Sequence, residues 1–282
     1  MLLGVSRHLH ALFWLGLLAL ANWEDRRIAG ARVMPPVEIF RGVTYECTRL
    51  PESAEGGGLA HMVRVDLAAP GIDLYLTPTD PTAAAQGHEY RLAHAERVAR
   101  DENLAVVVNG ALFRPDSFLL PMAGDWARGG ETVVAENQTN HVDPHSYLLW
   151  FDAKLVPRVE ATKPPPQSAL ERARFAIGGQ AVVLRDGRPR PWPAQRPDRR
   201  TLLGIDRDKK LLWLAVFERA TFQLAAATLA SRGALDAIPL DGGGSSTLFL
   251  GASRALPRSG CVVGGQRPIA TFVGIRANGV GS

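Results

Sequence analysis

Three successive glycines near the C-terminus place the strongest constraint on how this chain folds. Residues 234–240 form an apolar, strand-like run that ends in Asp241, and residues 242–244 are all glycine. Glycine runs cost backbone entropy, so they usually serve a positive-φ turn or a close approach to a ligand. Free amides in such a loop can bind an anion. The other interpretation is a tight turn capped by Ser245 or Ser246. A nucleotide P-loop is excluded, because no Gly-Lys-Ser/Thr follows.

An earlier segment repeats the same order of features. Residues 88–102 and 221–232 have apolar side chains at helical spacing, and each precedes a short buried strand, at 104–108 and 234–240. The first strand ends in Asn109-Gly110 and the second in Asp241-Gly242. We therefore expect two related halves whose polar corners meet in one cleft.

Strands outnumber helices in the rest of the chain. The sequence predicts strands at residues 42–50, 131–135, 147–151, 176–184, 201–206, 211–217 and 268–276. Alternation at 61–67 and 72–76, around a Pro-Gly turn, predicts a hairpin. Residues 114–130 form a long loop, and a loop of that length is usually functional or disordered.

The N-terminus has the pattern of an export signal. Arg7 precedes an apolar run that is too short for a comfortable membrane span and closes with Ala19-Leu20-Ala21. We predict a signal peptide at 1–21, with an uncleaved anchor as the alternative, and a periplasmic or secreted protein with no stable membrane span after cleavage. Residues 22–60 are expected to be an extension with a first strand, and 61–282 the main domain. The net charge of +4 is spread without basic clusters, which argues against nucleic-acid binding.

The cysteine and histidine content offers little for a metal site. Cys47 and Cys261 are either a disulfide or two buried thiols. His141 and His145 are four residues apart with Asp143 between them, but Pro144 predicts a loop and no third ligand is evident. We expect no metal and no cofactor.

Five segments, in order, resemble the phosphodiester glycosidase family. They are Val108-Asn109-Gly110-Ala111-Leu112-Phe113, Ile177-Gly178-Gly179-Gln180 with its following turn, Arg200-Thr201-Leu202-Leu203-Gly204, Leu240-Asp241-Gly242-Gly243-Gly244-Ser245-Ser246-Thr247, and Arg267-Pro268-Ile269-Ala270-Thr271-Phe272. The likeness runs from about residue 61 to 276. Two positions depart from it: Ala111 replaces a second glycine, and Phe217-Glu218-Arg219 stands where many members have Asp-Gly, which implies a shifted specificity.

The resemblance implies an α+β fold with mixed sheets and a few packed helices. It also implies hydrolysis of a sugar-1-phosphodiester between C1 and the phosphate oxygen, without identifying the sugar, the aglycone, the stereochemical outcome or the oligomeric state. Envelope polymers and exopolysaccharides are expected sources of such a substrate. The alternatives are a non-catalytic protein that binds glycans or assembles exopolysaccharide through the same cleft, and a phosphodiesterase that cuts the P–O bond.

Asp241, Arg200 and Asn109 are the expected catalytic residues. A guanidinium matches phosphate with two hydrogen bonds, which suits Arg200. Asp241 suits C1, as nucleophile, stabiliser or base for water, and Asn109 would position a sugar hydroxyl or phosphate oxygen. The structural alternatives are a surface ion pair for Arg200, a cap for Asp241 and a turn residue for Asn109. The expected substrate-binding residues are Gly110, Gly179, Thr201, Gly242, Gly243, Gly244, Ser245 and Ser246.

A phosphate leaving group is already acidic, so a second catalytic carboxylate is not required. If one acts, Glu131 and Asp125 near the long loop are the candidates. Trp126 in that loop is the tryptophan we expect to stack on a sugar, although tryptophans more often serve the core.

Overall fold

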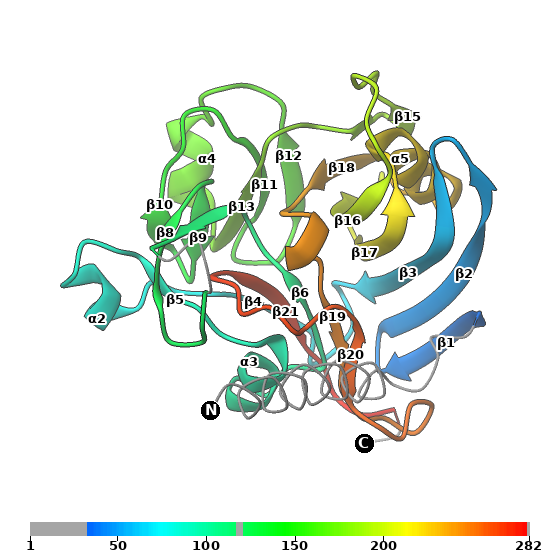
Figure 1. Cartoon of the computed structure of the whole chain (residues 1–282), viewed down its shortest axis with the longest axis horizontal. Helices are drawn as coiled ribbons and strands as arrows, with labels where there is room; N and C mark the ends of the chain where they lie inside the picture. Colours follow the sequence, from blue (N-terminus) through cyan, green and yellow to red (C-terminus); the bar gives the residue numbers. More distant parts are fainter. Residues whose placement is uncertain (1–32, 117–120, 281–282) are drawn as a thin grey trace, which may run out of the picture.

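The computed structural model describes residues 33–116 and 121–280 and is built mainly from β-strands (Figure 1). The expected signal peptide at 1–21 lies outside these residues. Within them no helix is long and apolar enough to cross a membrane.

An eight-stranded sheet forms one side of the molecule (Figure 1). Its strands, in spatial order, are β1 (Met34–Phe40), β2 (Val43–Ser53), β3 (Gly56–Asp66), β17 (Leu211–Ala220), β16 (Asp198–Ile205), β18 (Asp236–Pro239), β14 (Leu184–Arg185) and β15 (Arg188–Pro189). The expected boundary between residues 60 and 61 falls inside β3. Residues 34–60 are therefore part of this sheet.

Two five-stranded sheets and a small three-stranded sheet complete the β-structure. One consists of β10 (Gln138–His141), β9 (Val133–Ala135), β13 (Phe175–Gly179), β11 (Tyr147–Phe151) and β12 (Pro157–Glu160). The next consists of β20 (Gly260–Val263), β19 (Leu248–Leu250), β6 (Val106–Asn109), β21 (Phe272–Arg276) and β4 (Asp73–Leu76). The smallest consists of β5 (Tyr90–Arg91), β8 (Trp126–Gly129) and β7 (Phe113–Pro115), so the expected long loop at 114–130 contains two strands.

Four short α-helices and one 3-10 turn lie in the described residues. They are α2 (Pro81–Ala84), α3 (Ala95–Asp101), α4 (Gln167–Arg172), α5 (Phe222–Ser231) and η1 (Gly243–Ser245). The longest, α5, matches the helix expected at 221–232, and its N-cap Thr221 accepts a hydrogen bond from the Leu224 amide. The helix expected at 88–102 is shorter, because residues 90 and 91 pair in β5.

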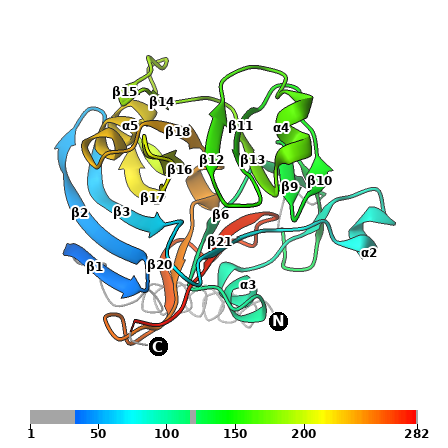
Figure 2. The same ribbon diagram turned by 180° about the vertical axis from the view of Figure 1, so that it is seen from behind.

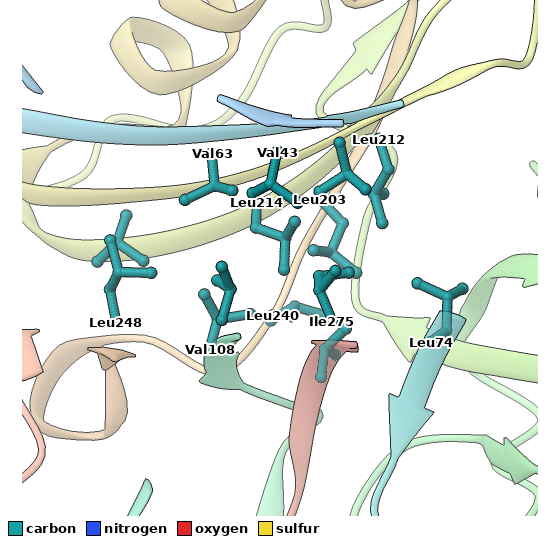
Figure 3. Close-up of a cluster of buried hydrophobic side chains, with 14 of the residues drawn as sticks. Val43, Val63, Leu74, Val108, Leu203, Leu212, Leu214, Leu240, Leu248 and Ile275 are labelled. Atoms are coloured by element: carbon teal, nitrogen blue, oxygen red, sulfur yellow. The ribbon is translucent and has the colours of Figure 1, made fainter. Parts of the chain in front are cut away.

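The main core lies between the eight-stranded sheet and the sheet of β4, β6, β19, β20 and β21. Figure 3 shows side chains from the two sheets facing each other: Val43, Val63, Leu203, Leu212 and Leu214 from one, and Leu74, Val108, Leu248 and Ile275 from the other, with Leu240 between them. Separate apolar clusters bury α5 against β16 and β17, and α4 against β11 and β13. Figure 2 shows α4 and α5 on the outer faces of their sheets, seen from behind.

Three expectations about the sheets need correction. Every strand pair in the described part is antiparallel, so the sheets are not mixed. The expected hairpin between 61–67 and 72–76 does not form: β3 pairs with β2 and β17, and β4 pairs with β21. The single strand expected at 176–184 is two strands, β13 and β14, in different sheets.

Candidate active site

Asp241 lies just beyond β18, where two polar corners meet. Its backbone N–H donates to the carbonyl of Gly110, with an N–O distance of 3.1 Å, and its own carbonyl accepts from the Asn109 side chain at 2.6 Å. The corners at Asn109-Gly110 and Asp241-Gly242 are thus in direct contact, as the repeated pattern suggested. Because β6 and β18 belong to different sheets, this contact joins the two sheets at the site.

The pKa of the Asp241 carboxyl is raised, chiefly because burial disfavours the charged form. A hydrogen bond from the Ser245 side chain, another from the Gly242 amide and the charge of Arg267 act in the opposite direction. The Gly242 amide is 2.8 Å from Oδ1 of Asp241. These groups hold the carboxylate in one orientation at a partly buried position.

The register of β16 and β18 brings Arg200 beside Asp241. Leu202 lies opposite Pro239 in this antiparallel pair, and the Leu240 amide donates to the Thr201 carbonyl at 2.8 Å. Continuing the same register places Arg200 opposite Asp241. The antiparallel ladder therefore brings the backbones of Arg200 and Asp241 side by side at the ends of their strands.

The Arg200 guanidinium is held by backbone groups and an aromatic ring. It donates to the carbonyls of Ala220 and Arg196, both at 3.3 Å, and lies over the Phe222 ring at 4.5 Å from the ring centroid. Burial lowers its pKa, and Asp198 acts in the opposite direction. No salt bridge within 4.0 Å is found for Arg200 in the described residues, so its charge is not neutralised by a bound carboxylate.

Asn109 is completely buried beneath the loop. Besides its bond to Asp241, its Oδ1 accepts from the Thr201 hydroxyl at 2.7 Å and from the Thr247 amide at 3.1 Å. Thr201 is also fully buried. This placement suits positioning of the loop, whereas the sequence predicted that Asn109 and Thr201 would contact substrate.

The triple-glycine loop forms a 3-10 turn whose first amides are available. The Gly242 amide is used by Asp241, the Ser245 amide by Gly242, and the Ser246 amide by Gly243. In the described protein, no hydrogen bond is found for the amides of Gly243 and Gly244. Gly243 has φ +57°, a conformation that favours glycine.

Two arginines lie close to this loop from opposite ends. A Cβ at Gly242 would lie 3.6 Å from the guanidinium of Arg200, and a Cβ at Gly244 would lie 3.7 Å from that of Arg267. Both distances are ordinary van der Waals contacts, so the two guanidinium groups lie directly beside the loop. Two guanidinium groups and two free amides in one small region form a suitable site for a phosphate.

Gly110 and Gly179, which the sequence predicted to contact substrate, lie at close-packing positions. A Cβ at Gly110 would lie 2.6 Å from the Thr271 hydroxyl oxygen, and one at Gly179 would lie 2.5 Å from the Pro239 carbonyl oxygen. Both glycines allow backbones to approach at the base of the site. Gln180, next to Gly179, lines the cavity. Ser245 and Ser246 are buried in the turn, and the Ser246 hydroxyl has no hydrogen-bond partner in the described residues.

Glu131 is a second carboxylic acid in the same cavity. Its side chain is 3% exposed, and one of its oxygens accepts from the Leu112 amide at 2.9 Å. Burial raises its pKa to about 8; the Leu112 hydrogen bond lowers the pKa, and the negative charge of Asp241 raises it further. At neutral pH Glu131 is therefore mostly protonated, and it can donate a proton.

The cavity that contains these groups has a volume of about 340 Å³. Its lining combines Asp241, Glu131 and Arg200 with residues from loops and from the ends of strands and helices: Leu112, Gln180, Trp192, Gln195, Asp198, Phe222, Pro239, Leu240, Gly242 and Gly243. Sequence reasoning missed Trp192, Gln195 and Phe222, which come from the Pro/Arg-rich segment and the start of α5. Trp192 and Gln195 lie within eight positions of Arg200 in the sequence, and Phe222 lies at the start of the predicted helix. These positions were the available signal that the three residues could reach the site.

The candidates Asp125 and Trp126 lie away from this cavity. An Asp125 oxygen accepts from the Met122 amide at 2.7 Å. The Arg91 guanidinium covers the Trp126 ring at 4.1 Å from its centroid, and His88 stacks nearby. Trp126 is therefore occupied by protein contacts, and Trp192 is the tryptophan at the cavity.

The described cysteines and the pair His141 and His145 are buried or held by other contacts. Cys47 and Cys261 are buried and unpaired, and burial raises their thiol pKa values to about 11 and about 12. His141 lies 3.6 Å from Glu89, and the Asp143 carboxylate binds the His145 amide at 3.1 Å and the Ser146 hydroxyl. Across 33–116 and 121–280, no three His, Cys, Asp or Glu side chains are grouped to hold a metal ion.

Comparison with known proteins points to one family. The sequence model described as phosphodiester glycosidase matches residues 102–276, which is more than half of the chain. No curated protein sequence matches.

Solved structures share the fold at low sequence identity. The catalytic domain of zebrafish N-acetylglucosamine-1-phosphodiester alpha-N-acetylglucosaminidase, auto-inhibited by its pro-peptide, has a TM-score of 0.61 and 15% identity over 88% of this chain and 90% of that one. A hypothetical protein from Synechocystis has a TM-score of 0.59 and 14% identity, covering 87% and 64%. A putative exported protein from Burkholderia pseudomallei has a TM-score of 0.57 and 12% identity, covering 78% and 74%.

Proposed function

The chain belongs to the phosphodiester glycosidase family, and on that premise we propose that it is an enzyme that hydrolyses the C1–O bond of a sugar-1-phosphodiester. The observation that carries this proposal is that Asp241, Glu131 and Arg200 line one cavity of about 340 Å³. These groups meet the three needs of the reaction: a group that acts at C1, a proton donor and a cation for the phosphate.

Arg200 binds the phosphate in this proposal. It makes no salt bridge within 4.0 Å in the described residues, and only the more distant charge of Asp198 acts on it, so it can bind an anionic substrate. The free amides of Gly243 and Gly244, and the guanidinium of Arg267 near the other end of the loop, add further donors. Together they fix the phosphate and stabilise the charge that it gains when the C1–O bond breaks.

Asp241 acts at C1 and Glu131 supplies the proton. The C1–O bond breaks with its electron pair going to the phosphate oxygen, which takes the proton of Glu131. A water oxygen bonds to C1, directly or after an Asp241 adduct, and the water proton goes to a carboxylate. The products are a free sugar and a phosphate monoester, and proton exchange with solvent restores both acids.

Turnover of a defined substrate tests the proposal. The purified protein would be screened against sugar-1-phosphodiesters with and without a chelator, and the active substrate would then be hydrolysed in ¹⁸O-labelled water. Label in the sugar supports C1–O cleavage. Label in the phosphate would instead identify a phosphodiesterase that cuts the P–O bond.

Asp241→Asn separates an enzyme from a glycan-binding or polymer-assembly protein. We expect kcat to fall by about 10²–10⁴-fold while substrate still binds, because the amide keeps the shape and loses the charge. Asp206→Asn, in the turn between β16 and β17, is the matched control and should keep wild-type turnover. Equal turnover by the Asp241→Asn variant and wild type would contradict the proposed role.

Export is part of the same proposal. Residues 1–21 have the pattern of a signal peptide, and one structural neighbour is described as a putative exported protein. We expect N-terminal sequencing of the mature protein from the periplasm or medium to begin at Asn22. A mature protein that remains in the cytoplasm with Met1 intact would contradict this expectation. An envelope polymer or exopolysaccharide then becomes the accessible source of substrate.

A further inference from the structure

A second cavity, of about 600 Å³, adjoins the one that contains Asp241. The two share Trp192, Gln195 and Phe222, and the second is otherwise lined by Ala54, Glu55, Pro189, Pro191, Pro193, Ala194, Thr221 and Gln223. We propose that this second cavity binds the aglycone of the substrate and that the aglycone is a hydrocarbon chain, so that the substrate is a lipid-linked sugar-1-phosphate. This inference rests on the proposed function.

The second cavity lies where the second substituent of a bound phosphodiester would extend. The sugar occupies the space beside Asp241 and Glu131, and the phosphate lies against Arg200. The second substituent of the phosphate must then extend away from those carboxyl groups. Arg200 lies over the Phe222 ring, and Phe222 belongs to both cavities, so a chain that leaves the phosphate at Arg200 passes this ring.

The lining of the second cavity favours hydrocarbon over carbohydrate. Proline, alanine, tryptophan and phenylalanine side chains supply most of it. Its three prolines have no backbone N–H, so this part of the wall offers few donors to sugar hydroxyls. The Thr221 hydroxyl already accepts from the Leu224 amide as a helix cap. A volume of this size lies within the range of about 300–1,000 Å³ that is typical of ligand pockets.

Gln195 marks the boundary between the two cavities. Its side-chain oxygen is buried and has no hydrogen-bond partner in the described residues. A buried acceptor without a partner costs free energy unless a ligand or water supplies a donor. A sugar hydroxyl next to the phosphate would supply that donor, which is an independent sign that a ligand spans this boundary.

Unpaired arginines surround the apolar segment. Arg188, Arg190 and Arg196 are exposed, and none has a salt bridge within 4.0 Å in the part of the chain that the structure describes. Cations beside an apolar surface that contains a tryptophan suit contact with anionic lipid headgroups. This charge distribution matches a substrate whose hydrocarbon end comes from a lipid surface.

Three esters of the same sugar-1-phosphate test the inference, with methyl, geranyl and mannosyl aglycones. We expect kcat/KM for the geranyl ester to exceed that for the methyl ester by about tenfold or more, because each methylene removed from water favours binding. All measurements are made below the concentration at which the geranyl ester forms micelles. Equal values for geranyl and methyl esters, or the highest value for the mannosyl ester, would overturn the inference.

Blocking the second cavity provides the matched variant. Ala54→Trp, in the turn between β2 and β3, should lower the ratio of geranyl to methyl kcat/KM toward one. Ala84→Trp, on α2 at the opposite side of the molecule from α5 (Figure 1), should leave that ratio unchanged. A geranyl preference that persists in Ala54→Trp would contradict the assigned site.

Binding of a product analogue separates this inference from the proposed function. Geranyl phosphate should bind the wild-type protein at least about tenfold more tightly than methyl phosphate in calorimetry, and Ala54→Trp should remove the difference. This measurement needs no turnover. Absence of hydrolysis would therefore defeat the proposed function alone, whereas equal binding of the two phosphates would defeat the hydrocarbon subsite.

Discussion

Glu131 and Asp241 share a cavity but have different surroundings. Glu131 is 3% exposed and accepts one backbone hydrogen bond, whereas Asp241 receives donors from Gly242 and Ser245 and the field of Arg267. Burial raises the pKa of both carboxyls, but these donors and the Arg267 charge oppose that rise at Asp241, so the surroundings favour the ionised form more at Asp241 than at Glu131. Pairs of carboxyl groups separated in this way are typical of acid–base division of labour in hydrolysis.

The pH dependence of kcat in Glu131→Gln tests these separate roles of the two carboxyl groups. We expect wild-type kcat to fall as pH rises through about 8, because the proton that Glu131 donates is lost there. The variant should have kcat lower by about 10²-fold at pH 7, near the small end of general-acid effects, since a phosphate leaving group needs little assistance. Its residual activity should lack the decline near pH 8.

Initial rates between pH 5 and 10 provide the measurement, with Glu171→Gln on the exposed face of α4 as the control. The control should keep both the rate and the alkaline decline. If Glu131→Gln retained wild-type rates at pH 7, Glu131 would not be the proton donor.

Asn109→Asp tests whether the buried amide positions Asp241. The substitution replaces the donor that faces the Asp241 carbonyl with an oxygen, so two acceptors lie together in a buried site. We expect a loss of about 1–3 kcal/mol in the free energy of unfolding and a kcat/KM at least about tenfold lower. Asn140→Asp, which loses a similar bond to the Thr77 carbonyl, should lower stability and leave turnover unchanged. Chemical denaturation and steady-state kinetics measure the two effects.

Residue chemistry made part of this site predictable. Asp241, Arg200 and Glu131 have side chains suited to the reaction and were identified from the sequence. The buried roles of Asn109 and Thr201 were not, because an amide and a hydroxyl suit a substrate contact and an internal hydrogen bond equally well. Trp192 and Gln195 were missed, since a Pro/Arg-rich loop shows no periodicity that indicates where it folds back.

At the scale of elements, strand pairing determines the site. β16 and β18 were both recognised as strands, but β17 and α5 separate them in sequence, and no turn fixes their register. That register puts Arg200 next to Asp241. The expected hairpin at 61–76 failed for the same reason: alternation identifies extended chain, while side-chain burial in other sheets selects the partner.

Gly179→Ala tests the contact between β13 and the end of β18. The new methyl group would lie 2.5 Å from the Pro239 carbonyl, which is backbone and cannot rotate away. We expect a loss of about 1–3 kcal/mol in stability, together with lower kcat/KM, because relief of the clash moves the segment that leads to Asp241. A Cβ at Gly187 would have open space around it. Gly187→Ala should therefore lose stability only because alanine is strained at a φ of +71°, and its turnover should be unchanged. Equal kinetics in both variants would contradict this coupling.

The described residues form four antiparallel sheets, and the eight-stranded sheet packs face to face with the sheet of β4, β6, β19, β20 and β21. The sequence predicted many strands and few helices, and both were found, but mixed sheets were not. Short turns join β1 to β2, β2 to β3, β9 to β10, β11 to β12, β14 to β15 and β16 to β17, whereas longer connections separate the members of the other strand pairs. The relation between two halves stays a prediction; what the structure adds is contact between their two corners.

The N-terminal strands should be required for folding. A chain that begins at residue 61 lacks β1, β2 and the start of β3, which removes Val43, Tyr45 and other side chains from the main core. We expect this chain to be insoluble or unfolded by circular dichroism, whereas a chain that begins at residue 33 should show cooperative unfolding. Cooperative unfolding of the shorter chain would show that residues 61–282 form an independent unit.

The bond between Asn109 and Asp241 spans 132 positions of the chain. Closing a loop of this length costs conformational entropy, so we expect the bond to form after the nearer hairpins. A nascent or translocating polypeptide thus holds both groups far from each other and has no assembled centre. Hydrolytic activity therefore requires that the sheets have packed together. The time at which activity appears during refolding would report this last folding step.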